Sequence, residues 1–267
     1  MTQGLFWAVF AGYLSGWALI FINFETERDA LYALGRRILL VSFAAHWVWV
    51  AHLCVGTDAP RSILWQSTIP VVIIGITLLT EWRTRVRFLL LFSLPIVLLL
   101  SVLLGKGLSS DADSSLSGGW LKFHLGFILA GLAGFIVSVS AALMYLWQSA
   151  QLKSRHPGQP FLKLPPLATL DRLHFRALVW GVVFFSVGIA AGVVWARDLR
   201  ELGSVLRDPK AVLSFLSCAM YWGIVSLRLS ALRRGQKIAI GTLAVFLLLF
   251  LAIGSTHVAP GAIHGGR

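Results

Sequence analysis

AIGTLAVFLLLFLAIG, residues 239–254, is a run near the end of the chain that contains no charged side chain. A helix that crosses a bilayer needs roughly 20 mostly apolar residues, and with its flanks this run supplies residues 237–257. Seven more stretches of the same kind precede it, at residues 4–24, 37–55, 65–80, 86–104, 122–147, 175–196 and 211–229. The sequence therefore predicts an all-α fold, a polytopic integral membrane bundle of about eight helices that forms a single transmembrane domain over residues 1–267.

The composition supports a membrane protein. Hydrophobic residues make up 57% of the chain, only 13% are charged, and the mean hydropathy is +0.80. An ordinary soluble domain contains fewer apolar and more charged residues. The apolar runs are long and lack the alternating pattern of an outer-membrane barrel, so helices are expected rather than strands. No basic residue precedes the first run, which is expected to stay as the first helix instead of being removed as a signal.

The formal net charge of +12 could indicate a nucleic-acid partner, but the positions of the basic residues argue against one. Most of the 23 Lys and Arg residues surround the short loops after the first, third, fifth and seventh spans. By the positive-inside rule these loops are cytoplasmic, and both termini are extracytoplasmic. We therefore expect membrane lipid, and no nucleic acid, around the chain.

The predicted topology sorts the histidines. Four lie at or beyond the outer ends of their helices: His52, His124, His257 and His264. His46 lies near the middle of the second span, where a hydrogen bond to a neighbouring helix and ligation of a metal are equally open. His156 and His174 fall on the cytoplasmic side and are expected to be solvated.

Four histidines at one face could bind an iron macrocycle. The sequence has no close Cys or carboxylate ligands and no H-x-x-x-H pattern, which a zinc or copper site would normally show. Haem needs only one or two imidazoles, apolar walls and cations for its propionates. Tryptophans near that face could supply walls, although they also suit a membrane interface: Trp47, Trp49, Trp120 and Trp195. The loop RDLRELGSVLRDPK, residues 197–210, contains four basic residues, but its acidic residues would neutralise most of that charge in a simple surface helix.

Several stretches match a known family in order along the chain: WLKFHLGFILAGLAG, LPPLATLDRL, GIAAGVVWA, DPKAVLSFLSCAMYW and GAIHGG. From His124 onward the sequence resembles the cytochrome c assembly proteins (the CcsA/CcmC-like haem-handling proteins), and in particular their shorter, eight-helix HemX/YpjD-like branch. The resemblance covers about half of the chain.

The resemblance implies a function and a site. It implies that haem b is held at the outer face by His124 and His264, with no bond chemistry and therefore no enzyme activity. The other cofactor-binding residues would be Trp120, Trp195, Arg197, Arg200, Arg207, Asp208 and Lys210, and the possible additional ligands are His46, His52 and His257. It further implies a multi-pass protein of a bacterial-type inner membrane, whose partner is an apocytochrome or another membrane protein of cytochrome c assembly.

Two departures from the family pattern favour a different reading. The loop that is rich in tryptophan in the family retains only Trp195 before Asp208, and Ser226 stands where many relatives have a histidine. The alternative is a scaffold or regulatory subunit without haem, which would belong to a larger assembly or to tetrapyrrole synthesis.

Overall fold

A computed structural model describes residues 2–26, 28–55, 61–107, 119–154, 159–198, 203, 207–230 and 235–254. These residues form helices and short turns, with no strand among them. The eight long helices are α1 (Thr2–Thr26), α2 (Asp29–Val55), α3 (Arg61–Thr84), α4 (Leu89–Gly107), α5 (Gly119–Ser154), α7 (Leu167–Asp198), α9 (Pro209–Leu229) and α10 (Gln236–Gly254). The short helix α6 (Gln159–Lys163) lies between α5 and α7. The all-α helix bundle is therefore confirmed.

Six of these helices are long and apolar enough to cross a membrane: α1, α2, α5, α7, α9 and α10. Helix α4 adds a shorter apolar stretch, Leu89–Leu103. Helix α3 has the length of a span but is more polar, and the total of eight spans in one domain stays a prediction. The chain is a multi-pass membrane protein.

The fourth span was expected at about residues 86–104, and the helix in this region, α4, begins at Leu89. A turn precedes it, in which Arg85 and Phe88 have positive φ values of 55° and 68°. Backbone in this left-handed region cannot continue an α-helix. The turn separates α3 from α4 and holds two arginines, Arg85 and Arg87, outside both helices.

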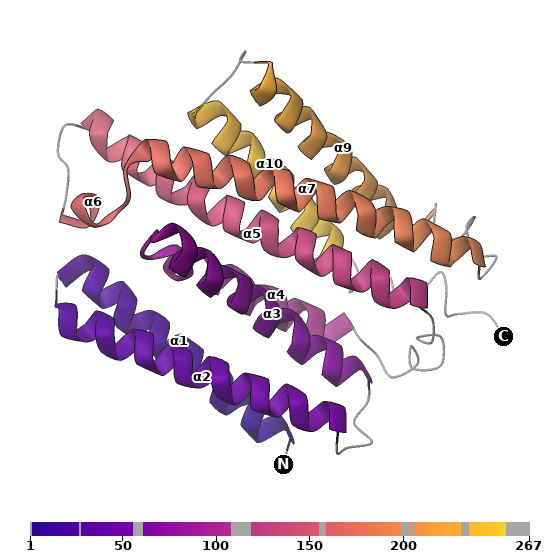
Figure 1. Cartoon of the computed structure of the whole chain (residues 1–267), viewed down its shortest axis with the longest axis horizontal. Coiled ribbons are helices and arrows are strands. Elements are labelled where there is room, and N and C mark those ends of the chain that lie inside the picture. Colours follow the sequence, from indigo (N-terminus) through magenta and orange to yellow (C-terminus); the bar gives the residue numbers. More distant parts are fainter. Residues whose placement is uncertain are drawn as a thin grey trace.

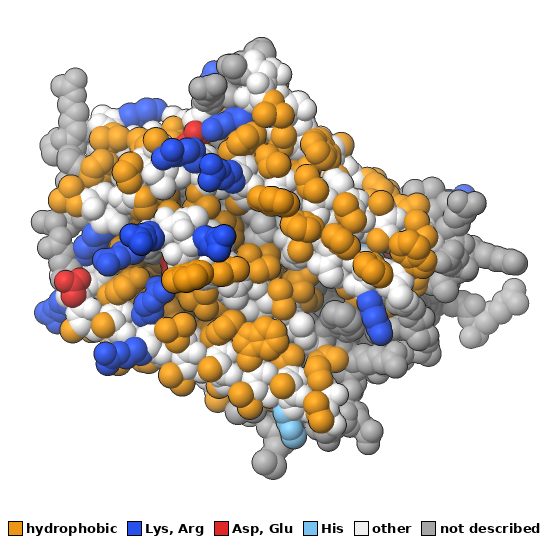
Figure 2. Space-filling view, in the orientation of Figure 1, with side chains coloured by type: hydrophobic (Ala, Val, Ile, Leu, Met, Phe, Trp, Pro, Cys, Tyr) orange, Lys and Arg blue, Asp and Glu red, His pale blue; other side chains and the backbone are white. Residues whose placement is uncertain are grey.

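The helices run back and forth between two ends of the bundle (Figure 1). Helices α1, α3 and α5 begin at the end where α2 and α7 finish, and α6 lies at the opposite end. We call the first the α5-start end and the second the α6 end. Most Lys and Arg side chains visible in Figure 2 gather at the α6 end, while hydrophobic side chains cover much of the rest of that face.

Helices α5 and α7 make the most extensive contact in the bundle, and glycines bring their backbones together. A Cβ atom added to Gly134 would lie 2.7 Å from the Cα atom of Gly181, and one added to Gly131 would lie 2.7 Å from the backbone nitrogen of Phe185. Small residues allow this close approach, which favours helix association in a membrane through van der Waals contact. The α5–α7 pair fixes which α7 residues lie beside the start of α5.

His174 corrects one expectation. It was expected to be solvated, but only 1% of the residue is exposed. Because α7 begins at Leu167, His174 lies two turns inside the helix and packs between α5 and α10. Its Nε2 atom lies 3.0 Å from the hydroxyl of Thr242, and its backbone carbonyl accepts a hydrogen bond from Ser138. His156 lies outside the described residues.

Candidate functional site

His124 lies at the α5-start end, in the second turn of α5 and beside the last turns of α7. Its Nδ1 atom is 2.7 Å from the backbone carbonyl oxygen of Gly188. A carbonyl oxygen can only accept a hydrogen bond, so Nδ1 must be the atom that donates the proton. In the neutral ring the lone pair is then on Nε2. This is the tautomer and the type of backbone support that orient a histidine for metal ligation.

Two glycines of α7 lie beside this ring: Gly188 accepts its hydrogen bond, and Gly192 leaves room for the ring itself. Gly188 and Gly192 are separated by one helical turn in the sequence GIAAG, so they lie on one face of α7. A Cβ atom at Gly192 would lie 2.6 Å from Nδ1 and 2.8 Å from Cε1 of His124. The imidazole of His124 therefore packs directly on the bare backbone of α7, which no larger residue at 192 would permit without displacement.

Two of the predicted tryptophans share helix faces with these residues. Trp120 precedes His124 by one turn of α5, so the two residues lie on one face of that helix. Trp195 follows Gly192 by nearly one turn of α7, so these two also share a face. Trp120 is 49% exposed and contacts Phe123 with a ring separation of 6.3 Å. Trp195 is half-buried. Helical spacing thus places Trp120 on the face of α5 that carries His124, and Trp195 on the face of α7 that carries Gly192.

Several predicted residues are not placed beside His124. His257, His264 and Arg200 lie outside the described residues, and only the backbone of Arg197 and Lys210 is described. Arg207 is exposed and Asp208 is half-buried at the start of α9. His52 is exposed near the end of α2. The second ligand and the cationic rim therefore stay predictions.

His46 has the partner that its position in the second span requires. It is 3% exposed, and its Nδ1 atom lies 3.2 Å from the hydroxyl of Tyr13 on α1. Its ring also stacks on Trp49, with centroids 5.9 Å apart. Its Nε2 atom is buried, and the backbone of Ser67 on α3 lies beside the ring. A hydrogen bond to a neighbouring helix is therefore present, and this bond involves only one ring nitrogen.

Trp47 and Ser226 do not face the buried contacts of His46. Trp47 is 46% exposed, whereas Trp49 is buried, because positions two apart on a helix face different sides. Ser226 is exposed on α9, and its backbone carbonyl accepts a hydrogen bond from Ser230. Neither residue supports a second site around His46. Within the described ranges, no three His, Cys, Asp or Glu side chains form a group that could hold a metal ion.

Two features of the structure were not predicted from the sequence. Gly188 and Gly192 support His124, and the small-xxx-small spacing of GIAAG could have indicated a close helix contact. Asp171 and Arg228 form a bidentate ion pair between α7 and α9, with N–O distances of 2.7 and 2.6 Å. They lie far apart in the sequence, and the opposite charges alone gave no reason to join them.

A protein-family comparison matches most of the chain. The model of the cytochrome C assembly protein family matches residues 37–262. Cytochrome c biogenesis protein CcsA from Prochlorococcus marinus subsp. pastoris is 25% identical over 174 residues, which are 58% of this chain and 55% of CcsA. Protein HemX from Bacillus subtilis is 23% identical over 213 residues, which are 78% of this chain and 76% of HemX.

The matched region thus spans little more than half the length of the CcsA proteins. A second CcsA, from another strain of Prochlorococcus marinus, is 26% identical over 57% of this chain and 56% of its own length. No solved structure matches the chain. The helical fold and the family model, which extends from α2 to beyond α10, agree on one assignment: the chain belongs to the cytochrome c assembly protein family.

Proposed function

We propose that this protein binds haem b at the α5-start end of its helix bundle, with His124 and His264 as the residues that would ligate the iron. The observation that carries the proposal is the hydrogen bond from His124 Nδ1 to the Gly188 carbonyl, because it leaves Nε2 as the ring nitrogen that can bind iron. The names of the CcsA relatives support a role in cytochrome c biogenesis.

The residues at this end suit an iron macrocycle. The ring of His124 is half-buried, and Trp120 and Trp195 lie on the same helix faces as the residues around it. Apolar and aromatic walls beside an imidazole are what haem requires from a protein. Bound haem would supply an iron that imidazole nitrogens can ligate. His124 would hold it through Nε2, and Gly192 would let its ring stay against α7.

The remaining parts of the proposal rest on the sequence. His264 follows α10 in a glycine-rich segment, and glycine lets a backbone approach a flat ligand closely. Arg197, Arg200, Arg207 and Lys210 are the proposed propionate partners, since guanidinium and ammonium groups pair with carboxylates. The sequence offers His46, His52 and His257 as candidate additional ligands, and the contact between His46 and the Tyr13 hydroxyl favours a structural role for His46.

The proposed setting is a bacterial-type inner membrane with both termini extracytoplasmic. The charge distribution supports it, since Lys and Arg gather at the α6 end, which would face the cytoplasm (Figure 2). The protein would hold haem for an apocytochrome or another membrane protein of cytochrome c assembly. It would make and break no bonds of the haem, so we assign it no enzyme activity.

The test is the absorption spectrum of the purified protein. We expect a Soret band in the purified wild-type protein, and we expect the double change His124→Ala and His264→Ala to remove it. Phe123→Ala is the matched control, because Phe123 neighbours His124 but is 60% exposed on another side of α5. A Soret band of full intensity in the double variant would refute the ligand assignment.

One alternative function is favoured by a specific observation. The exposed Ser226 and the loop with few tryptophans depart from the family pattern, which suits a scaffold or regulatory subunit without haem. Purification distinguishes the two. A protein that is colourless in detergent and carries a stoichiometric partner supports the scaffold, whereas a coloured protein supports haem binding.

A further inference from the structure

A cavity of about 680 Å³ opens at the α6 end of the bundle, far from His124. It lies between α2 and the turn that joins α3 to α4, and four arginines and one carboxylate take part in its lining. The lining residues are Tyr32, Arg36, Glu81, Trp82, Arg83, Arg85, Val86 and Arg87. With all five charged groups ionised, the lining has an excess of three positive charges.

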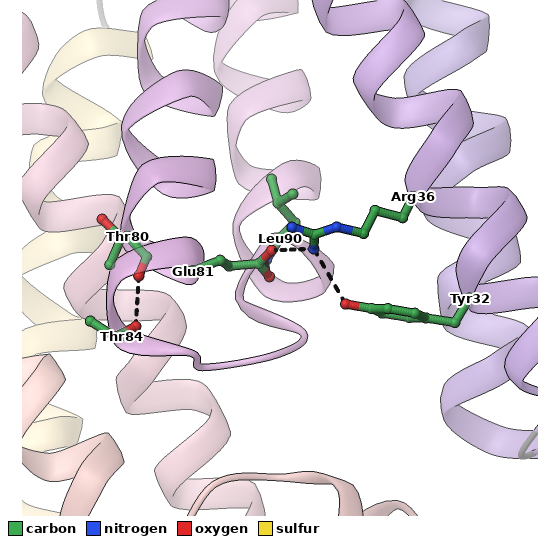
Figure 3. A network of polar contacts seen from close by, with 6 residues as sticks. All are labelled: Tyr32, Arg36, Thr80, Glu81, Thr84 and Leu90. Carbon is green, nitrogen blue, oxygen red and sulfur yellow. Dashed lines mark hydrogen bonds and ion pairs between the residues drawn. The ribbon is translucent and has the colours of Figure 1, made fainter.

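One of the arginines is fixed in place by its neighbours (Figure 3). A terminal nitrogen of Arg36 donates to a Glu81 carboxylate oxygen at 3.1 Å and lies 3.3 Å from the Tyr32 hydroxyl. The other carboxylate oxygen accepts the backbone N–H of Leu90 at 3.0 Å. Glu81 is therefore fully engaged, with only 5% of the residue exposed. The carboxylate neutralises Arg36 and ties α2 to the start of α4.

The other three arginines have a different setting. Arg83, Arg85 and Arg87 are exposed, and neither of the two ion pairs found among the described residues involves them. Arg85 has a φ of 55° and Phe88 a φ of 68°, so the segment between them leaves the helical path and turns at the mouth of the cavity. The Glu81–Leu90 hydrogen bond closes this turn from inside. The last turn of α3 and the following turn thus place Arg83, Arg85 and Arg87 in the lining of the cavity.

We propose that this cavity binds a phosphate group, as found in the headgroup of an anionic phospholipid. Guanidinium groups bind phosphate oxygens in bidentate geometry, and three of them here have no carboxylate partner in the described structure. Basic pockets between transmembrane helices on the cytoplasmic side are typical lipid-headgroup sites. Trp82 is 70% exposed at the same rim, where an indole suits the membrane interface.

The size and the position of the cavity fit this ligand. Small-molecule sites usually have volumes of about 300–1,000 Å³, so 680 Å³ admits a headgroup rather than a single water. Helices α2, α3 and α4 all start or end beside it, which places the cavity at the depth of lipid phosphates if these helices cross the bilayer. The site is separate from the proposed haem site, and a colourless protein could still contain it.

The test measures thermal unfolding of the full-length protein in nanodiscs of phosphatidylcholine, with or without phosphatidylglycerol. The variant is Arg85→Asn with Arg87→Gln, because asparagine tolerates a positive φ and neither change touches the Arg36–Glu81 pair. The matched control is Arg172→Gln with Arg176→Gln. These two arginines are exposed on α7 near the same end and carry the same charge.

We expect phosphatidylglycerol to raise the unfolding temperature of the wild type and the control. The variant should need about 30-fold more phosphatidylglycerol for the same rise, because it lacks two arginines. Inorganic phosphate, added to phosphatidylcholine nanodiscs, separates the two sources of the ligand. An equal rise with inorganic phosphate would support the site with a soluble ligand, and no rise would support the lipid. The proposal would be overturned if phosphatidylglycerol raised the unfolding temperature of the variant as much as that of the wild type. It would also be overturned if the control lost as much of this rise as the variant. If the variant unfolds early in phosphatidylcholine alone, Arg83→Gln replaces it.

Discussion

Gly192 on α7 lies directly against the imidazole ring of His124 on α5: a Cβ atom at position 192 would come within 2.6 Å of Nδ1. The ring is held from the same side by the carbonyl of Gly188. The backbone of α7 thus holds an imidazole that belongs to α5.

Gly192→Ala should therefore lower haem retention without removing either proposed ligand. The added methyl group must push the ring away from α7 and lengthen or break its bond to Gly188. Loss of such a supporting hydrogen bond typically costs metal sites about 10–100-fold in affinity. Haem content per chain, measured after purification, checks this. Gly126→Ala is the control, because a Cβ there meets nothing within 4 Å, and equal haem content in both variants would contradict the account.

The contact between α5 and α7 makes a prediction about stability. Gly134→Ala should lower the free energy of unfolding by about 1–3 kcal/mol, because the new Cβ would lie 2.7 Å from backbone Cα of Gly181 and backbone cannot yield as a flexible side chain can. Unfolding in mixed detergent measures the change. Gly223→Ala on α9 has open space around its Cβ and should leave stability nearly unaltered. Equal stability of the two variants would show that the helices are not so closely packed.

His46 is expected to stabilise the bundle and not to bind the haem. Tyr13→Phe should cost about 1 kcal/mol of unfolding free energy, because it removes the hydroxyl that bonds Nδ1. His46→Gln should leave the haem content per chain unchanged. A halved haem content in that variant would instead make His46 a ligand, and the single-haem account would be wrong.

The Asp171–Arg228 pair should couple α7 to α9. Both side chains are largely buried, with 24% and 11% exposed, and the guanidinium bonds both carboxylate oxygens. Arg228→Lys keeps the charge but loses the bidentate geometry, so it should destabilise the protein by about 1–2 kcal/mol. The double change Asp171→Asn with Arg228→Gln should cost less than the sum of the single changes. Strict additivity in this cycle would mean that the pair contributes no interaction energy.

The membrane class of the fold was predictable because length and hydropathy suffice for it. Each predicted span lies largely within one long helix. The start of α4 at Leu89 follows from the positive φ values of Arg85 and Phe88, which composition does not reveal. His174 was wrongly expected to be solvated, because its burial depends on where α7 begins. That start at Leu167 follows a proline pair and was not assigned from the sequence.

The candidate site was predictable only in part. His124 could be chosen from the family resemblance, but its support by Gly188 and Gly192 depends on the register between α5 and α7. Register arises from side-chain packing across the interface, which one sequence does not specify. For the same reason the sequence did not predict the Arg36–Glu81 pair or the arginine cavity, both of which depend on how α2 packs beside the α3–α4 turn.

The electron paramagnetic resonance spectrum of the purified ferric protein tests the central claim most directly, because it reports the axial ligands of the iron. The account predicts a low-spin signal of two imidazole ligands in the wild type, its loss in His124→Gly, and its return when free imidazole is added to that variant. An identical low-spin signal in the wild type and His124→Gly would show that another residue binds the iron and would contradict the account.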